Sequence, residues 1–255
     1  MRSRRSKGFV LSGLPVLLLS FAGFGESQPQ SRVPVLAELF TSEGCNSCPP
    51  ADRLLEMLLE EQPLEGIYVV PLSEHVTYWD HQGWKDPFGS PQFTARQQQY
   101  GLRFNLDSVY TPQLVIDGTR EFVGSDKQSI ERALSGATKA PKPALTVAAT
   151  ERDSMIEVSA SGPGLKVESD AEVWFAITED HMSIDVKRGE NADKTLKHSG
   201  VVRVLRSAGN ADRAAPIEIK LLPDWRHDNL RVVSFVQSRK SHKVLSVGFT
   251  ELGTR

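Results

Sequence analysis

The chain contains two cysteines, Cys45 and Cys48, which two residues separate in the stretch TSEGCNSCPPAD. A disulfide across so short a loop removes little entropy from the unfolded chain, so it is a weak structural staple. Two thiols at this spacing can exchange disulfides with a partner, or they can bind a soft metal ion. The spacing therefore favours chemistry, although an inert local disulfide remains a third interpretation.

The sequence around the pair predicts different roles for the two thiols. An apolar run at 33–40 predicts a buried strand, and a helix is expected from Pro49, because proline fits only the first turn. A helix start offers free N–H groups and the positive end of the dipole, which can lower a cysteine pKa to roughly 3.5–7.5. Cys45 is the predicted nucleophile and Cys48 the resolving cysteine, and this chemistry needs no organic cofactor.

A copper site is the alternative for the same cysteines. Two thiolates and an imidazole suit Cu(I), and His75 ends the next predicted strand, whose carboxyl end meets the start of the cysteine helix. His75 is otherwise a proton shuttle or a structural histidine. Glu38 is a candidate for moving protons beneath the cysteines, or else a solvated glutamate at a strand end. Trp79 is expected either to line a groove near Cys45 or to form a hydrophobic cap.

Several elements are needed to position these residues. Strand, helix and strand between 33 and 72 predict a parallel βαβ unit. Strands at 113–116 and 120–123 flank Asp117-Gly118, which is a strong hairpin signal, and a helix capped by Ser125 follows. The insertion at 73–110 holds eight aromatic residues and one helix, which is expected to begin after Ser90 and to end before Gly101.

The pattern changes after a stiff APKP linker at 140–143. Seven short alternating runs between 145 and 252 predict strands, which favours an antiparallel sandwich at 143–255. The polar stretch KRGENADKTLKH, with Arg188, Glu190, Asn191 and His198, is interpreted as a loop whose turn is held by side-chain hydrogen bonds.

The N-terminus and the composition indicate where the protein works. Basic residues, an apolar run at 9–24 and then small polar residues predict a signal peptide at 1–28, with cleavage near 25–29. The expected location is therefore periplasmic or secreted, without stable membrane insertion after cleavage. A net charge of −2 gives no basic excess for nucleic acid. The expected partners are protein thiols or disulfides of the cell envelope.

The motifs also carry two resemblances. The order strand, C-x-x-C, helix, strand, Thr-Pro, hairpin, helix resembles the thioredoxin fold, in which a cis-proline faces the cysteine pair. This implies a site role for Pro112 and a supporting role for Thr111. Gly44 departs from that fold, because thioredoxins usually carry tryptophan before the first cysteine. The chain is also similar to the exported bacterial proteins of domain-of-unknown-function family 1223, through ELFTSEGCNSCPPAD, HVTYWDHQGWKDPF, VYTPQLVIDG and GENADKTLKHSGVVR.

The sequence thus predicts an α/β thioredoxin-like N-terminal domain at 33–138, with an aromatic-rich insertion at 73–110, followed by an all-β antiparallel sandwich at 143–255. The predicted function is thiol–disulfide exchange through the C-x-x-C pair. A Cu(I)-binding chaperone and a non-catalytic binding module are the alternatives. The family resemblance implies no settled substrate.

Overall fold

The computed structural model describes residues 32–252, so the signal peptide predicted at 1–28 lies outside the described residues. Within this range the chain forms three α-helices and thirteen strands, joined by turns and short 3₁₀ segments. The helices are α1 (Pro49–Glu61), α2 (Pro91–Phe104) and α3 (Lys127–Ser135). The strands are β1 (Val33–Thr41), β2 (Ile67–His75), β3 (Gln113–Ile116), β4 (Arg120–Val123), β5 (Thr146–Arg152), β6 (Met155–Ser161), β7 (Ala171–Glu179), β8 (Met182–Asp185), β9 (Thr195–His198), β10 (Val201–Asn210), β11 (Ile217–Lys220), β12 (Leu230–Ser238) and β13 (Val244–Glu251).

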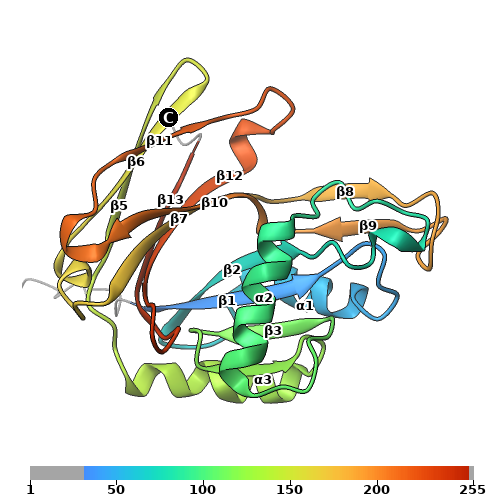
Figure 1. Ribbon diagram of the computed structural model, residues 1–255, viewed down its shortest axis with the longest axis horizontal. Coiled ribbons are helices and arrows are strands. Elements are labelled where there is room, and N and C mark those ends of the chain that lie inside the picture. Colours follow the sequence, from blue (N-terminus) through green and yellow to red (C-terminus); the bar gives the residue numbers. More distant parts are fainter. Residues whose placement is uncertain (1–31, 253–255) are drawn as a thin grey trace, which may run out of the picture. The chain divides into compact units, whose positions relative to one another are not determined.

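One large mixed sheet takes strands from both halves of the chain, in the order β13-β12-β7-β10-β2-β1-β3-β4 (Figure 1). The predicted parallel pairing of β1 with β2 is present, and β3 pairs antiparallel with β1. β10 then lies parallel to β2 on its other side. The predicted fold class is therefore wrong, because the strands do not separate into an α/β thioredoxin-like domain and an all-β antiparallel sandwich.

The joint between β2 and β10 is short and depends on backbone geometry. Ser73 pairs with Val201, and the Ser73 amide donates to the Gly200 carbonyl over 2.7 Å. Gly200 has a φ of +67°, and a Cβ atom there would lie 3.1 Å from the carbonyl oxygen of Pro71. Glycine supplies both the left-handed conformation and the close approach. Strand periodicity predicts that these segments are strands, but it carries no information about such distant neighbours.

The large sheet curls until β13 reaches β1. Five strand spacings separate these two strands, or roughly 24 Å in a flat sheet. However, Asp117 contacts both sides: its amide donates to the Leu36 carbonyl, and its own carbonyl accepts from the Val244 amide, each over 2.9 Å. Asp117 Oδ2 also pairs with Lys142 Nζ at 2.7 Å. The turn between β3 and β4 therefore links the two strands that the curvature of the sheet brings together, β1 and β13.

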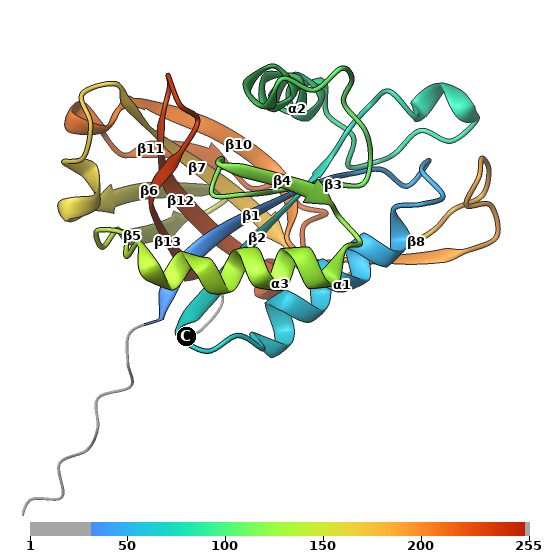
Figure 2. The same ribbon diagram turned by 90° about the horizontal axis from the view of Figure 1, so that it is seen from below.

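Helices cover both faces of the sheet near its N-terminal strands. Figure 2 shows α1 and α3 on one face and α2 on the other. Apolar residues of α1 and α3, such as Leu55 and Ile130, pack against β1, β2 and β3. Phe93 of α2 joins the core on the opposite face. The smaller sheet β11-β6-β5 packs against β7, β12 and β13 through a third core.

Local predictions fare better than the fold class. The hairpin around Asp117-Gly118 is confirmed, and Ser90 caps α2 by accepting from the Gln92 amide. The predicted end of α2 is wrong. Gly101 lies inside the helix, where a Cβ would come 2.8 Å from Val109. The helix ends at Phe104, and Asn105, with a φ of 55°, is its C-cap residue.

The cap predicted for α3 is also displaced by one residue. Asp126, rather than Ser125, accepts from the Ser129 amide at 3.1 Å. Both residue types favour this position, so the sequence pattern alone could not separate two adjacent candidates.

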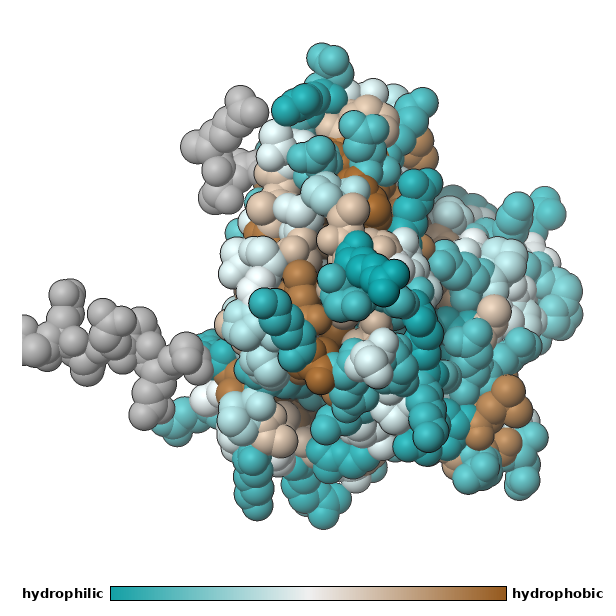
Figure 3. All heavy atoms as spheres, turned by 60° about the vertical axis from the view of Figure 1, so that its left-hand side comes forward, coloured by the Kyte–Doolittle hydropathy of each residue, from teal (hydrophilic) through white to brown (hydrophobic). Residues whose placement is uncertain are grey.

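The face drawn in Figure 3 is mostly hydrophilic, and its apolar side chains form small separate areas. The large apolar side chains that are exposed among residues 32–252 are Leu102, Val123 and Leu222. In the same range, no helix has both the length and the apolar character needed to cross a membrane.

Candidate functional site

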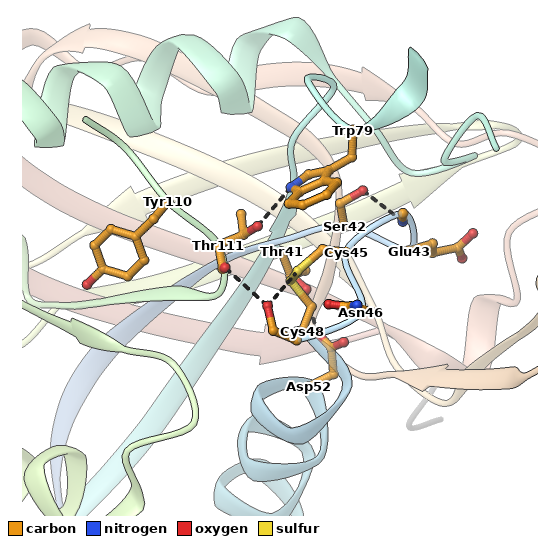
Figure 4. Close-up of a disulfide and its surroundings, with 12 residues drawn as sticks. Thr41, Ser42, Glu43, Cys45, Asn46, Cys48, Asp52, Trp79, Tyr110 and Thr111 are labelled. Carbon is orange, nitrogen blue, oxygen red and sulfur yellow. Dashed lines mark hydrogen bonds between the residues drawn. A yellow bond between two sulfur atoms is a disulfide. The ribbon is translucent and has the colours of Figure 1, made fainter. Parts of the chain in front are cut away.

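The two cysteines form a disulfide at the start of α1 (Figure 4). We call residues 42–48 the cysteine loop; it joins the end of β1 to the helix, as the sequence predicts. Cys48 is the N-cap residue of α1, and its carbonyl accepts from the amides of Ala51 and Asp52. Both cysteines are fully buried, whereas Asn46 and Ser47 between them are exposed.

Trp79 and Thr111 cover the disulfide from one side, as Figure 4 shows. Trp79 Nε1 donates to Thr111 Oγ1 over 2.8 Å. A Cβ on Gly44 would lie 2.9 Å from the Cβ of Trp79, so glycine is what allows the indole-bearing backbone to pack on the cysteine loop. Trp79 therefore caps the cysteine loop. The position before Cys45 is a glycine because a larger residue would clash with Trp79.

The Thr111-Pro112 peptide bond is cis, like the cis-proline of the fold that the sequence resembles. Ser47 Oγ donates to the Thr111 carbonyl over 3.5 Å, so the segment before β3 contacts the cysteine loop. Gly124 packs against both Pro112 and Ala51 of α1: a Cβ at Gly124 would be 3.0 Å from the Cβ of each. Pro112 thus lies beside the first turn of the cysteine helix.

A hairpin from the C-terminal half also reaches the cysteine loop. β8 pairs with β9, and their connecting loop carries Glu190 and Asn191. Asn191 is fully buried, and its Nδ2 donates to the carbonyl oxygens of Glu43 and Cys45 over 2.8 and 2.9 Å. Glu190 Oε2 accepts from the Asn46 amide at 3.3 Å. The predicted turn therefore holds the cysteine loop rather than only itself.

Five buried titratable side chains lie together beneath the loop: Glu43, Asp52, His75, Asp86 and His198. We call them the acid–histidine cluster. Asp86 Oδ2 contacts His75 Nδ1 at 2.8 Å and accepts from the Glu43 amide, also at 2.8 Å. Glu43 Oε2 accepts from Trp84 Nε1 over 2.6 Å. One side of the cluster is thus tied directly to the backbone of the cysteine loop.

The other side of the cluster joins α1 to β9. Asp52 Oδ1 accepts from Thr41 Oγ1 over 2.9 Å. His198 lies between two carboxylates, with Nε2 3.7 Å from Glu43 Oε1 and Nδ1 3.8 Å from Asp52 Oδ2. Neither nitrogen of His198 has a hydrogen-bond partner, and the same holds for Nε2 of His75. The described part of the chain leaves these three ring nitrogens buried and unpaired.

The cluster has shifted proton affinities. Burial raises the pKa of Glu43, and the charge of Asp86 raises it further, against the donation from Trp84. Burial would lower the pKa of His75, but the charge of Asp86 and the hydrogen bond to it leave that pKa raised. Burial would raise the pKa of Asp86, yet His75 lowers it to about 2. His75 and Asp86 therefore form an ion pair, while Glu43 holds its proton more tightly than an ordinary glutamic acid.

The structure places Glu38 in a different set of contacts. Its Oε1 accepts from Arg96 Nε and its Oε2 from Tyr100 Oη, each over 2.6 Å. Gln237 contacts both partners, with Oε1 3.2 Å from Arg96 Nη1 and Nε2 2.9 Å from Tyr100 Oη. We call these four residues and Glu74 the Arg96 network. Glu38 is thus occupied by Arg96 and Tyr100.

Each of the three residues of the alternative copper site, Cys45, Cys48 and His75, is engaged in another contact. Cys45 and Cys48 are bonded to each other, and His75 pairs with Asp86. Among residues 32–252, no group of three or more histidine, cysteine or acidic side chains is arranged to hold a metal ion.

Sequence reasoning predicts Cys45, Cys48, His75, Thr111, Pro112 and Trp79 near one another, but it misses half of the surroundings. Asn191 and His198 come from a stretch interpreted as a simple turn. Glu43, Asp52 and Asp86 gave no periodic or spacing signal. The available clue was that all five lie in the stretches that carried the family resemblance, and these stretches meet at the disulfide.

The chain belongs to the family described as Protein of unknown function (DUF1223), which matches residues 36–237. It is similar in fold to the crystal structure of protein AGR_C_4864 from Agrobacterium tumefaciens, with a TM-score of 0.67, 23% identity, and coverage of 89% of this chain and 97% of that one. It is also similar in fold to HBP35 of Porphyromonas gingivalis, with a TM-score of 0.58, 14% identity, and coverage of 87% and 76%. No curated protein matches the chain.

Proposed function

We propose that the protein exchanges disulfides with protein thiols of the cell envelope through Cys45 and Cys48. The observation that carries this proposal is the position of the disulfide: it closes a small loop at a helix N-terminus, directly above buried groups that can bind and release protons. A staple of this size adds little stability.

In the proposed exchange, Cys45 is the sulfur that is attacked and Cys48 is the sulfur that leaves. A thiolate of the partner attacks Sγ of Cys45, the bond between Cys45 and Cys48 breaks, and Cys48 leaves as a thiolate. A second thiolate of the partner then attacks the partner's sulfur in the mixed disulfide and releases Cys45. The partner dithiol is oxidised to a disulfide, and the protein disulfide is reduced to two thiols. The reverse sequence transfers a disulfide to the protein.

Access favours Cys45 as the sulfur that is attacked. Its Sγ lies 3.3 Å from Oγ of the exposed Ser47, whereas Cys48 caps the helix. Since both cysteines are fully buried, a partner must displace Ser47 or Trp79 before it can react. The expected partner is therefore a flexible segment that can take the place of these side chains. The expected location follows from the signal peptide predicted at 1–28, because disulfides persist outside the cytoplasm.

The test is a redox titration of the protein against glutathione, together with trapping in the variant Cys48→Ala. We expect a reversible dithiol–disulfide couple in the wild type and stable mixed disulfides on Cys45 in the variant, because no resolving thiol remains. The matched control is Cys45→Ala, which should trap far less. Absence of a reversible couple, together with tight Cu(I) binding that is lost in His75→Ala, would instead support the copper chaperone.

A further inference from the structure

A pocket of about 350 Å³ lies beside the Arg96 network, and Arg96, Tyr100 and Gln237 line it. One wall comes from α2. The other comes from β7, the end of β12 and the turn that joins β12 to β13, so both halves of the chain contribute. Its volume is within the range of pockets that bind small molecules. We call it the Arg96 pocket; its other lining residues include Glu172, Trp174, Arg239 and His242.

Arg96 gives this pocket a permanent positive charge, because a guanidinium keeps its proton in proteins. The residue is 8% exposed, and Glu38 Oε1 lies 2.6 Å from its Nε and 2.5 Å from its Nη2. Nη1 makes one hydrogen bond, to Gln237 Oε1, although it carries two N–H groups. Within residues 32–252, one N–H of Nη1 therefore has no partner.

Arg239 supplies a second cation on the turn after β12, and its side chain is 47% exposed. Its Nη2 donates to Asn210 Oδ1, and its Nε lies 3.6 Å from Glu172 Oε2. In the described part of the chain Nη1 makes no hydrogen bond, so both of its N–H groups can bind an anion. Among the described residues, Glu172 is the one acidic side chain that lines the pocket, and it also accepts from Ser207 Oγ.

His242 shows that the pocket is electropositive. It lies on the turn between β12 and β13, and its ring centre is 5.7 Å from that of Tyr100 on α2. Burial lowers the pKa of His242, and the charges of Arg96 and Arg103 lower it further, although the charge of Glu38 on β1 opposes them. The two arginines therefore outweigh the buried carboxylate at this position, and an anionic group is attracted to the pocket.

Trp174 forms an apolar wall next to these cations. Its ring centre is 5.6 Å from the guanidinium carbon of Arg96, and the side chain is partly exposed. Phe235, which is fully buried, stacks on Trp174 with the two ring planes 10° apart. A planar apolar group that packs on Trp174 would remove apolar surface from water, which stabilises binding.

We propose that the Arg96 pocket binds a small organic carboxylate that carries an aromatic ring. The carboxylate accepts from the free N–H groups of Arg96 and Arg239, and the ring packs against Trp174. Glu38 stays in place, because it engages Nε and Nη2 of Arg96 and leaves Nη1 to the ligand. Phosphate has no apolar part to cover Trp174, so the pocket favours a carboxylate with a ring. Neither cysteine lines the pocket, so this binding does not depend on the proposed disulfide exchange.

The test is isothermal titration calorimetry of the purified protein. Two probes carry the expected chemistry from different sources: phenylacetate represents a free acid, and N-acetyl-glycyl-phenylalanine represents the carboxyl end of a peptide. The comparison compounds are phenylacetamide, which keeps the ring without the charge, and inorganic phosphate, which has charge without a ring. The variants are Arg239→Gln and Trp174→Leu, and the matched control is Arg53→Gln on the exposed face of α1.

We expect at least one of the two acids to bind the wild type about 10-fold more tightly than phenylacetamide or phosphate does. Arg239→Gln should weaken this binding about 10- to 100-fold, because it removes a charge-assisted hydrogen bond. Trp174→Leu should weaken it about 3- to 10-fold through the loss of the ring contact. Arg53→Gln should bind as the wild type does. The acid that binds more tightly identifies the source of the ligand.

Absence of binding by both acids up to about 10 mM would overturn the proposal. Equal affinity for phenylacetamide, or tighter binding of phosphate, would overturn it as well, because either result removes one half of the proposed chemistry. A loss in Arg53→Gln as large as that in Arg239→Gln would show that the binding is not at this pocket. Urea unfolding checks that each variant is folded. If Arg239→Gln or Trp174→Leu does not fold, Arg239→Lys decides: it keeps the charge without the planar fork, so wild-type affinity in this variant would contradict the proposed contact.

Discussion

Two buried polar clusters lie at the carboxyl ends of β1 and β2, and they are built on opposite rules. In the Arg96 network, a permanently charged guanidinium holds Glu38, and Tyr100 and Gln237 complete the contacts. In the acid–histidine cluster, three carboxylates lie near His75 and His198, which carry a positive charge only when they are protonated. Several polar atoms of this cluster have no hydrogen-bond partner. The comparison shows that the permanent charge of Arg96 suits a structural role. The acid–histidine cluster can instead change its charge by gaining or losing protons.

Glu74 shows how the Arg96 network avoids a second buried charge. Both of its carboxylate oxygens lack hydrogen-bond partners, and its nearest cation, Arg96 Nε, lies 3.6 Å away. Burial raises the pKa of Glu74 well above its usual range, against the opposing charge of Arg96. Glu74 therefore holds its proton more tightly than an ordinary glutamic acid, and the shorter ion pair of Arg96 is the one with Glu38.

The largest expected effect comes from removing the guanidinium. Arg96→Met leaves Glu38 buried without its partner, so we expect a loss of about 3–5 kcal/mol in the free energy of unfolding, measured in urea at neutral pH. The control is Arg53→Met on the exposed face of α1, which should change stability by less than about 0.5 kcal/mol. A similar small change for Arg96→Met would show that the network is not the scaffold we describe.

A smaller and pH-dependent effect should distinguish the acid–histidine cluster. The pKa of Asp86 falls from 3.8 to about 2 on folding, so the folded protein binds this proton more weakly than the unfolded chain. Asp86 thus contributes about 2 kcal/mol that is fully present above about pH 4 and is lost as the pH falls toward 2.

The check for Asp86 is urea unfolding at several pH values between 2 and 7. Asp86→Asn should be less stable than wild type at neutral pH, and the two should converge in acid. The exposed Asp107→Asn should follow wild type throughout. If Asp86→Asn keeps a constant difference from wild type down to pH 2, the ion pair with His75 is not what stabilises this side of the cluster.

The smallest pair of effects tests the reach of the β8–β9 hairpin. Asn191→Ala removes two hydrogen bonds to the cysteine loop, so we expect a loss of about 1–2 kcal/mol and faster reduction of the disulfide by dithiothreitol. Glu190→Gln changes one exposed contact in the same loop and should cost less than about 0.5 kcal/mol. Equal reduction rates for both variants and wild type would mean that the hairpin does not restrain the loop.

The sequence carried the local structure of this protein far better than its fold class. Alternation and turn residues are properties of short windows, so the seven C-terminal runs, the cysteine helix and the Asp117-Gly118 hairpin could be predicted. The pairing of Ser73 with Val201 depends on Gly200 fitting against Pro71, and no short window contains both. The two halves therefore looked like separate domains although their strands form one sheet.

The candidate site was predictable to the same extent. Cys45, Cys48 and His75 each lie at a strand or helix end that periodicity locates. Asn191 and His198 reach the disulfide only because the β8–β9 hairpin folds back over α1, and these two short strands were missed. Polar residues in a loop have many possible partners, so sequence alone could not distinguish a self-contained turn from one that holds another segment.

The place of β10 beside β2 has a consequence for how the chain is made. During synthesis, β1 to β4 leave the ribosome long before β10 exists, and until then β2 presents an edge of unpaired backbone groups. Such an edge is a template for association with another chain, and pairing between strands so distant in sequence is slow. The interval between the emergence of β2 and that of β10 is therefore the period in which the nascent chain most needs a chaperone to prevent aggregation.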